Sequence, residues 1–266
     1  MPISDTGRRP WGDFWTQVST GQIPGAIPLC VIGENSNLTG NPTGGQDIWE
    51  GPTDAIPIPD PTGVSLEIVS NDSNDTLLGS GANLVQFYYI DTSGAEVISS
   101  PMALNGLTPV DTGITDCVYI NSFFVVQAGN VTIQGSAVAI GEVHLRDSST
   151  GTVYSLIGPN GNQSLACSFM VPASKMFIVG VWSTSITGTK VGSMRIRATA
   201  TERGTSVPVF LFKDTFKIAN GYDTAPFPAP FPVMEGDIVK ISGFFPAAGG
   251  ASAGAASFHG AMLNAP

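Results

Sequence analysis

Charge is scarce in this sequence. Only 12% of the 266 residues are Asp, Glu, Lys or Arg, about half of the usual ~25%. Acidic residues outnumber basic ones by 21 to 11, which gives a net charge of −10. A surface of that sign repels a phosphate backbone, because few cations are present to neutralise it. We therefore expect no nucleic-acid partner.

Long apolar runs are also missing. No stretch reaches the ~18 apolar residues of a membrane span, and the first residues, MPISDTGRRPWG, lack the apolar centre of a signal peptide. Cys30, Cys117 and Cys167 are odd in number and far apart in hydrophobic settings, which is typical of reduced, buried thiols made in a cytosol. We expect no membrane partner and no secretion through a signal peptide.

Histidine is limited to His144 and His259, and neither has the spacing of a zinc site. The sequence contains no Gly-x-Ser-x-Gly nucleophile motif, and its glycine-rich stretches are not followed by Lys-Ser/Thr as a phosphate-binding loop requires. We interpret His144, in an alternating run with Glu142 and Arg146, as part of a polar face. The expectation is no catalytic residue, no metal and no cofactor.

Two site chemistries stay open. A pair of carboxylates on different strands could cleave a polysaccharide, because sequence spacing does not constrain such pairs in a β fold. Residues 71–75, NDSND, offer oxygens that suit calcium, but they lack the Gly and the terminal Glu of an EF-hand loop and are more typical of a hairpin turn. The aromatic residues inside β-rich runs favour packing over stacking on sugars. They are Tyr88, Tyr89, Tyr119, Tyr154 and Trp182.

Glycine and proline are abundant, at 32 and 20 residues, and both disfavour helix interiors. Only residues 13–19 and the Ala-rich tail tolerate a helix. From residue 64 onward, short β-rich runs alternate with turn clusters. The runs are 64–69, 82–90, 96–99, 117–127, 131–133, 142–146, 153–157, 164–170, 176–182, 192–200, 207–217 and 237–244. This spacing predicts an all-β fold, an antiparallel β-sandwich of jelly-roll type, over residues 63–266.

Residues 1–62 differ from the rest in carrying nine prolines and three tryptophans. Proline at this density blocks helices and central strands, while tryptophan side chains are costly to leave in water. We predict an extended N-terminal arm over residues 1–62. Its anchors are Trp11, Phe14, Trp15, Ile48 and Trp49. The arm either docks on a partner subunit or wraps its own domain, and the sequence supports both equally.

Two runs, 123–126 and 177–182, are apolar at consecutive positions, so both of their faces must be covered. A second sheet, the arm or a neighbouring subunit could do this, and a homo-oligomer is one economical solution. Residues 225–232, APFPAPFP, predict a rigid extended segment. The Gly/Ala-rich segment 247–256 is either a close-packed strand or a mobile loop.

Residues 43–51, TGGQDIWEG, resemble a motif found in a family of structural proteins of tailed bacteriophages. Further similar segments are 69–75, 104–110, 119–125 and 171–175, so the resemblance covers roughly residues 43 to 200. The last segment reads Pro-Ala-Ser-Lys where the family more usually has Pro-Ala-Gly-Lys. The motif also makes physical sense alone: Gly44 and Gly45 permit a tight turn, Ile48 and Trp49 supply buried area, and Asp47 and Glu50 can accept backbone donors. We interpret it as a docking or folding latch.

The resemblance implies a virion component without known catalytic residues. The expected lack of a signal peptide and the reduced cysteines agree with assembly in the host cytoplasm. The expected partners are copies of the chain and other virion proteins of the capsid or of the tail and neck. The placement, as capsid decoration or as a tail or neck element such as a fibre base, stays open. A carbohydrate-binding receptor module is the alternative, and a polysaccharide hydrolase is a third reading.

Overall fold

The computed structural model describes residues 11–41, 43–129, 138–199, 210–246 and 252–265. Within these ranges the chain is almost entirely β, and every strand pair is antiparallel. The elements are α1 (Trp11–Ser19), β1 (Ile27–Leu38), β2 (Gln46–Asp47), β3 (Leu66–Ser70), β4 (Ala82–Asp91), β5 (Glu96–Ile98), β6 (Met102–Ala103), β7 (Val110–Asp111), β8 (Cys117–Ala128), β9 (Val143–Asp147), β10 (Val153–Ile157), β11 (Ser168–Met170), β12 (Lys175–Ala198), β13 (Leu211–Val233), β14 (Ile238–Phe244) and β15 (Ser252–Asn264). The predicted all-β antiparallel sandwich is confirmed, and so is the helical tolerance of residues 13–19.

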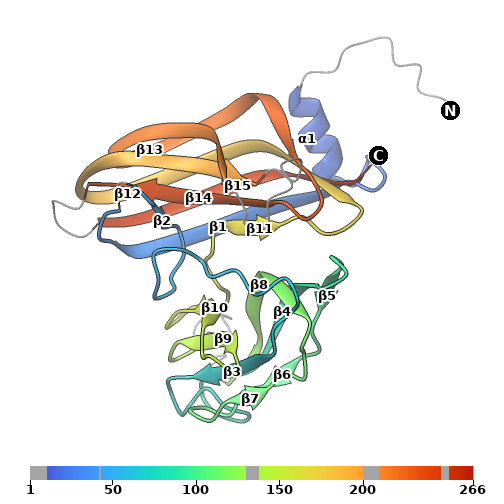
Figure 1. The fold of residues 1–266 in the computed structure, drawn as a ribbon, viewed down its shortest axis with the longest axis vertical. Coiled ribbons are helices and arrows are strands. Elements are labelled where there is room, and N and C mark those ends of the chain that lie inside the picture. The colour runs from blue at the N-terminus through green and yellow to red at the C-terminus, as the bar shows by residue number, and fades with distance from the viewer. Residues whose placement is uncertain (1–10, 42, 130–137, 200–209, 247–251, 266) are drawn as a thin grey trace.

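The larger unit is built around the long hairpin of β12 and β13. The first half of β12 pairs with β15, which in turn pairs with β1, and the second half of β12 pairs with β14. β13 accompanies β12 on its other side along both halves. We call one half of this sheet layer 1; it consists of β1, β15, the first half of β12 and the second half of β13. The other half, layer 2, consists of β14, β11, β2, the second half of β12 and the first half of β13. Figure 1 shows N-terminal β1 lying beside C-terminal β15.

The two layers enclose one apolar core. Trp182 from the first half of β12 and Phe216 from the first half of β13 stack with 4.2 Å between ring centroids. Phe177, Phe258 and Ile241 are fully buried in the same cluster. Alternation along β1 and β15 turns every second side chain inward, as expected for strands with one covered face. Burial of these side chains holds the layers together.

A second sandwich, β3 to β10, is inserted in the chain between β2 and β11. It consists of the sheet β10-β9-β3-β7 and of a sheet in which β4 pairs with β5, β6 and β8. Its own core includes Phe87, Phe123 and Leu145, all fully buried. Figure 1 shows this inserted unit, coloured cyan to yellow-green, next to β11 and β2. The prediction of one sandwich over 63–266 is therefore corrected to two.

The predicted extended arm over residues 1–62 is also corrected. Residues 11–19 form α1, and residues 27–38 form β1, which pairs with β15 over most of its length. The density of proline favours an arm, but β1 is an edge strand that pairs only with β15 among the described strands, and Pro28 is tolerated there. The segment 247–251 lies outside the described residues, whereas 252–264 is a close-packed strand.

One edge of β13, which pairs with no strand in the described part of the chain, is protected from further strand pairing. Thr215 and Thr224 donate their backbone N–H groups to the preceding side chains, Asp214 at 2.8 Å and Asp223 at 2.9 Å, instead of to a strand. Prolines follow at alternate positions from 226 to 232, in phase with Thr224, and have no N–H to offer. Natural sheets block exposed edges in this way to prevent aggregation.

Restoring those donors should cause association. We expect the triple variant Pro226→Thr, Pro230→Thr, Pro232→Thr to form larger species than the parent at equal concentration, because its edge can pair with other strands. Sedimentation velocity measures the size distribution. Pro159→Thr, in an exposed turn, is the control. An unchanged distribution for the triple variant would show that the prolines do not guard the edge.

Candidate functional site

The motif at residues 43–51 places β2 beside β14, with Gln46 and Asp47 opposite Gly243 and Ser242. Gly45 makes the turn into β2 with a φ of +75°, and a Cβ there would lie 2.7 Å from the Phe244 ring. Only glycine meets both conditions without strain. The expected tight turn is confirmed at this position.

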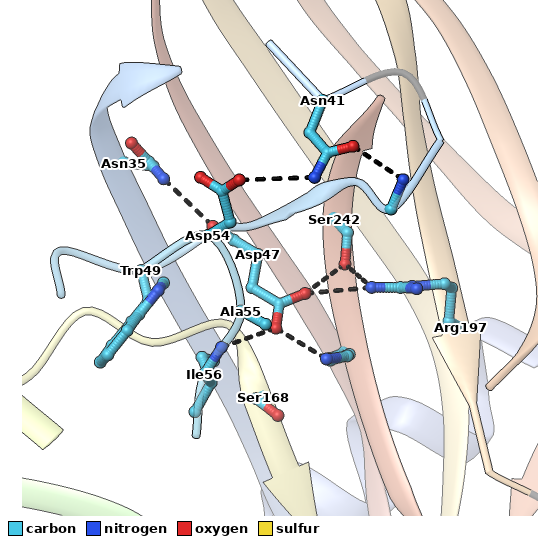
Figure 2. A network of polar contacts seen from close by, with 12 residues as sticks. Asn35, Asn41, Asp47, Trp49, Asp54, Ala55, Ile56, Ser168, Arg197 and Ser242 are labelled. Carbon is cyan, nitrogen blue, oxygen red and sulfur yellow. Dashed lines mark hydrogen bonds and ion pairs between the residues drawn. The ribbon is translucent and has the colours of Figure 1, made fainter. Parts of the chain in front are cut away.

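Asp47 is the centre of a buried polar network (Figure 2). Its side chain is 1% exposed and accepts four hydrogen bonds. Oδ1 accepts from Arg197 Nη2 at 3.0 Å and from Ser242 Oγ at 2.6 Å. Oδ2 accepts from Lys240 Nζ at 2.7 Å and from the backbone N–H of Ile56 at 2.9 Å. The carboxylate therefore has all its acceptor positions in use within the chain.

The backbone of Asp47 extends the network to β1. Its N–H donates to the Asp54 carbonyl at 2.6 Å, and its carbonyl accepts from Asn35 Nδ2 at 3.1 Å. One residue thus joins β1, β12, β14 and the segment at 54–56. We call Asp47 with Arg197, Lys240 and Ser242 the Asp47 latch, and its contacts agree with a folding role.

Burial sets the electrostatics of the Asp47 latch. Burial lowers the pKa of Lys240, and attraction to Asp47 opposes that shift. The pKa of Arg197 is lowered in the same way. The Lys240 ammonium also lies 4.3 Å from the centre of the Phe210 ring and makes a cation–π contact with it. Two largely desolvated cations thus depend on one carboxylate.

Ile48 and Trp49 are buried in their own chain, 0% and 1% exposed. The Ile48 carbonyl accepts from the Cys167 N–H at 2.8 Å, and Trp49 Nε1 donates to the Thr53 carbonyl at 2.8 Å. Both side chains are thus buried inside their own chain, which decides between the two alternatives left open for them, docking on a partner subunit and wrapping the chain's own domain. Of the two original alternatives, wrapping the chain's own domain is what they do.

Helix α1 carries the other three predicted anchors. Trp15 lies against β12, since a Cβ at Gly180 would be 2.1 Å from its indole, and its ring packs edge-on against Phe14 at 5.0 Å. Both aromatic side chains are only half-buried, whereas Val18 on the same helix is fully buried. The side chain of Trp11 lies outside what the structure describes. Docking of α1 on a partner stays a prediction.

Glu50, also in the motif, has a pKa raised above its ordinary value of 4.5 by burial and by repulsion from Glu34 and Glu142, while the N–H of Gly158 opposes the shift. Because the folded state favours the protonated acid, the stability from Glu50 is full below the unfolded-state pKa and is lost as pH rises through the folded-state pKa. Glu50→Gln should therefore raise the melting temperature at pH 7. The gain in the free energy of unfolding should be below about 1 kcal/mol, because solvent screens the charge of this half-buried group. The gain should vanish at pH 4, and a gain equal at both values would contradict the assigned charge effect.

The predicted calcium-like cluster is a hydrogen-bonded turn around a fully buried Asp75. Its oxygens accept from Ala82 N–H and Ser70 Oγ, at 2.8 and 2.7 Å, and from the N–H groups of Ile140 and Gly141, both at 2.9 Å. These oxygens face donors and not an open site. Among the described residues, no group of three His, Cys, Asp or Glu side chains is arranged to hold a metal.

The remaining sequence candidates are dispersed. His144 contacts Glu142 at 3.2 Å on a half-exposed face, in agreement with the polar-face interpretation. Cys117 and Cys167 are buried, with the pKa of Cys117 raised to about 12 by burial. The prediction that Cys30 is buried is wrong, because the alternation of side chains along β1 turns Cys30 outward.

Sequence reasoning missed a depression of about 370 Å³ on the outer face of layer 1, whose lining includes Glu34 and Tyr222. Of the aromatics it considered, Tyr89, Tyr119, Tyr154 and Trp182 are buried and Tyr88 stacks on Phe124. Tyr222 follows Asn220 and Gly221, a pair that is typical of turns. The exposure of the Tyr222 side chain could not be predicted without the knowledge that β13 is an edge strand.

No family model and no curated protein matches this sequence. Among solved structures, the chain is similar to "Structure of infectious bursal disease virus Gx strain" with 9% identity, covering 91% of this chain and 76% of that one at a TM-score of 0.20. A VP2 subviral particle of the same virus matches with 11% identity, 91% and 75% coverage and a TM-score of 0.19. TM-scores this low do not establish a common fold. No described helix is both long and apolar enough to cross a membrane.

Proposed function

We propose that this protein is a non-enzymatic structural component of a tailed-phage virion, which self-associates and is fixed to the particle as a capsid-decoration or tail and neck protein. The motif resemblance suggests this class. The Asp47 latch supports a structural role for the motif, because both carboxylate oxygens of Asp47 accept their hydrogen bonds from groups of the same chain.

The observation that carries the proposal is an exposed leucine tip on the inserted unit. We use this name for Leu77, Leu78 and Leu107, which are 52%, 93% and 63% exposed. They lie on neighbouring loops, since the Leu77 N–H donates to the Leu104 carbonyl at 3.1 Å. Apolar side chains gathered at the surface mark protein contacts.

The loop that carries the leucine tip has a strained backbone conformation at Leu78. Leu78 has a φ of +67°, a conformation that a non-glycine residue rarely adopts. The turn beside it is fixed by the four hydrogen bonds to Asp75. Backbone strain of this kind is kept where surrounding contacts enforce it and is common at binding loops. The tip is thus presented as a preformed contact.

Incorporation into particles tests the proposal. The triple variant Leu77→Ser, Leu78→Ser, Leu107→Ser should fold, since all three side chains are exposed, but should fail to join virions or to self-associate. A control with three scattered apolar residues of similar exposure, Ile27→Ser, Ile98→Ser and Val191→Ser, should incorporate normally.

Quantitative gel densitometry of purified particles gives the result and the placement together. Copy numbers that follow capsid symmetry indicate decoration, and a handful to a few dozen copies indicate a tail or neck element. Absence of the unmodified chain from virions would refute the proposal. Normal incorporation of the leucine variant would refute the role of the tip.

A further inference from the structure

The outer face of layer 1 holds four side chains in one row across four strands. Ala255 of β15 lies opposite both Glu34 of β1 and Ser185 of β12, and Ser185 lies opposite Tyr222 of β13. All four line the depression of about 370 Å³. The row therefore runs from a carboxylate, over two small side chains, to an aromatic ring.

The register fixes the dimensions of this depression. Neighbouring strands lie about 4.8 Å apart, so Glu34 and Tyr222 are separated by three spacings, roughly 14 Å. Ala255 and Ser185 between them are too small to fill the space, and they form a low floor between two taller ends. A ligand that touches both ends must be extended and flat enough to lie on this floor.

The next row adds hydroxyl groups to the floor. Ser183 and Ser257, opposite one another, share a hydrogen bond of 2.7 Å, and His259 lies 3.1 Å from the Ser257 oxygen. Each hydroxyl has further acceptor capacity toward a ligand. Tyr222 is 72% exposed and its hydroxyl is bonded to Thr224, which orients the ring beside the floor.

We propose that this depression binds a neutral oligosaccharide of two or three units. The apolar face of one sugar ring would stack on Tyr222, and hydroxyl groups along the chain would meet the serines and Glu34. An anionic sugar is disfavoured, because Glu34 is the single charged residue among the described residues that line the depression, and Glu50 is close enough to interact with it. The size agrees with known ligand pockets, which begin at about 300 Å³.

This site is separate from the proposed virion attachment. The depression lies on the larger sandwich, whereas the leucine tip lies on the inserted unit. Variants of the depression should therefore join particles normally, so failure of one proposal is distinguishable from failure of the other.

Saturation-transfer NMR on the full chain provides the test. The probes are cellotriose, maltotriose, mannotriose and triacetylchitotriose, with 3′-sialyllactose as the anionic comparison and pentalysine as a basic peptide. We expect at least one neutral probe to bind at millimolar concentration. Tyr222→Ala and Ala255→Leu, which fills the floor outward, should each weaken it at least about tenfold, and Tyr222→Phe should retain binding.

Tyr88→Ala, at an exposed tyrosine of the inserted unit, is the matched control and should bind like the parent. Absence of binding by all neutral probes would overturn the proposal. Binding that survives both Tyr222→Ala and Ala255→Leu would overturn it too, and so would binding of pentalysine or 3′-sialyllactose alone.

Discussion

Asp47→Ala should destabilise the protein by about 3–5 kcal/mol, which is the usual cost of removing one partner from a buried ion pair. The variant leaves Arg197 and Lys240, whose side chains are 12% and 8% exposed, without their carboxylate. It also removes the acceptor for the Ile56 N–H. Urea unfolding measures the loss as a lower midpoint at an unchanged slope.

The matched control is Asp54→Ala. Asp54 lies in the same segment but is exposed, and its carboxylate accepts from Gln46 Nε2 at 2.9 Å. We expect a loss of below about 1 kcal/mol there, as for other exposed polar contacts. Equal losses at the two positions would contradict the assignment of Asp47 as the buried carboxylate on which the Arg197 and Lys240 cations depend.

Asp75→Ala should cost at least about 3 kcal/mol, because it leaves four donors without an acceptor, and three of these hydrogen bonds are buried. Asp75→Asn should also be destabilising, since its amide group would point donors at donors. The inserted unit should respond most, and hydrogen exchange of the Ala82, Ile140 and Gly141 amides would detect local opening there.

Asp72→Ala is the control for this turn. Asp72 accepts from the Asn74 N–H at 2.8 Å at the surface of the turn. We expect a small loss of stability and unchanged exchange at the Ala82, Ile140 and Gly141 amides. Fast exchange in Asp72→Ala but not in Asp75→Ala would contradict the account of the turn.

The strand content could be predicted from local patterns, because alternation and turn residues are properties of short segments. Residues 193–200 and 142–146 are examples, and both lie in strands of the structure over most of their length. β1 could not be predicted, since it lies in a proline-rich part of the sequence and contains Pro28, which is compatible with a strand only at a sheet edge. The expectation of an extended segment over residues 225–232 agrees with the structure, where they form the end of β13.

The partners of the motif were beyond the reach of sequence reasoning. Arg197, Lys240 and Ser242 follow Asp47 by 150, 193 and 195 residues, and only the sheet register brings them together. The motif itself gave the turn at Gly45 and the burial of Ile48 and Trp49. It could not tell whether the buried area lay within the chain or between chains.

Locating this subunit in an electron-microscopy reconstruction of the phage particle tests the proposed role most directly. We expect repeated copies fixed to a shell or a tube, with the leucine tip of the inserted unit at a contact with a neighbouring protein. A particle that lacks the chain, together with a solitary protein that degrades a sugar polymer in solution, would contradict it.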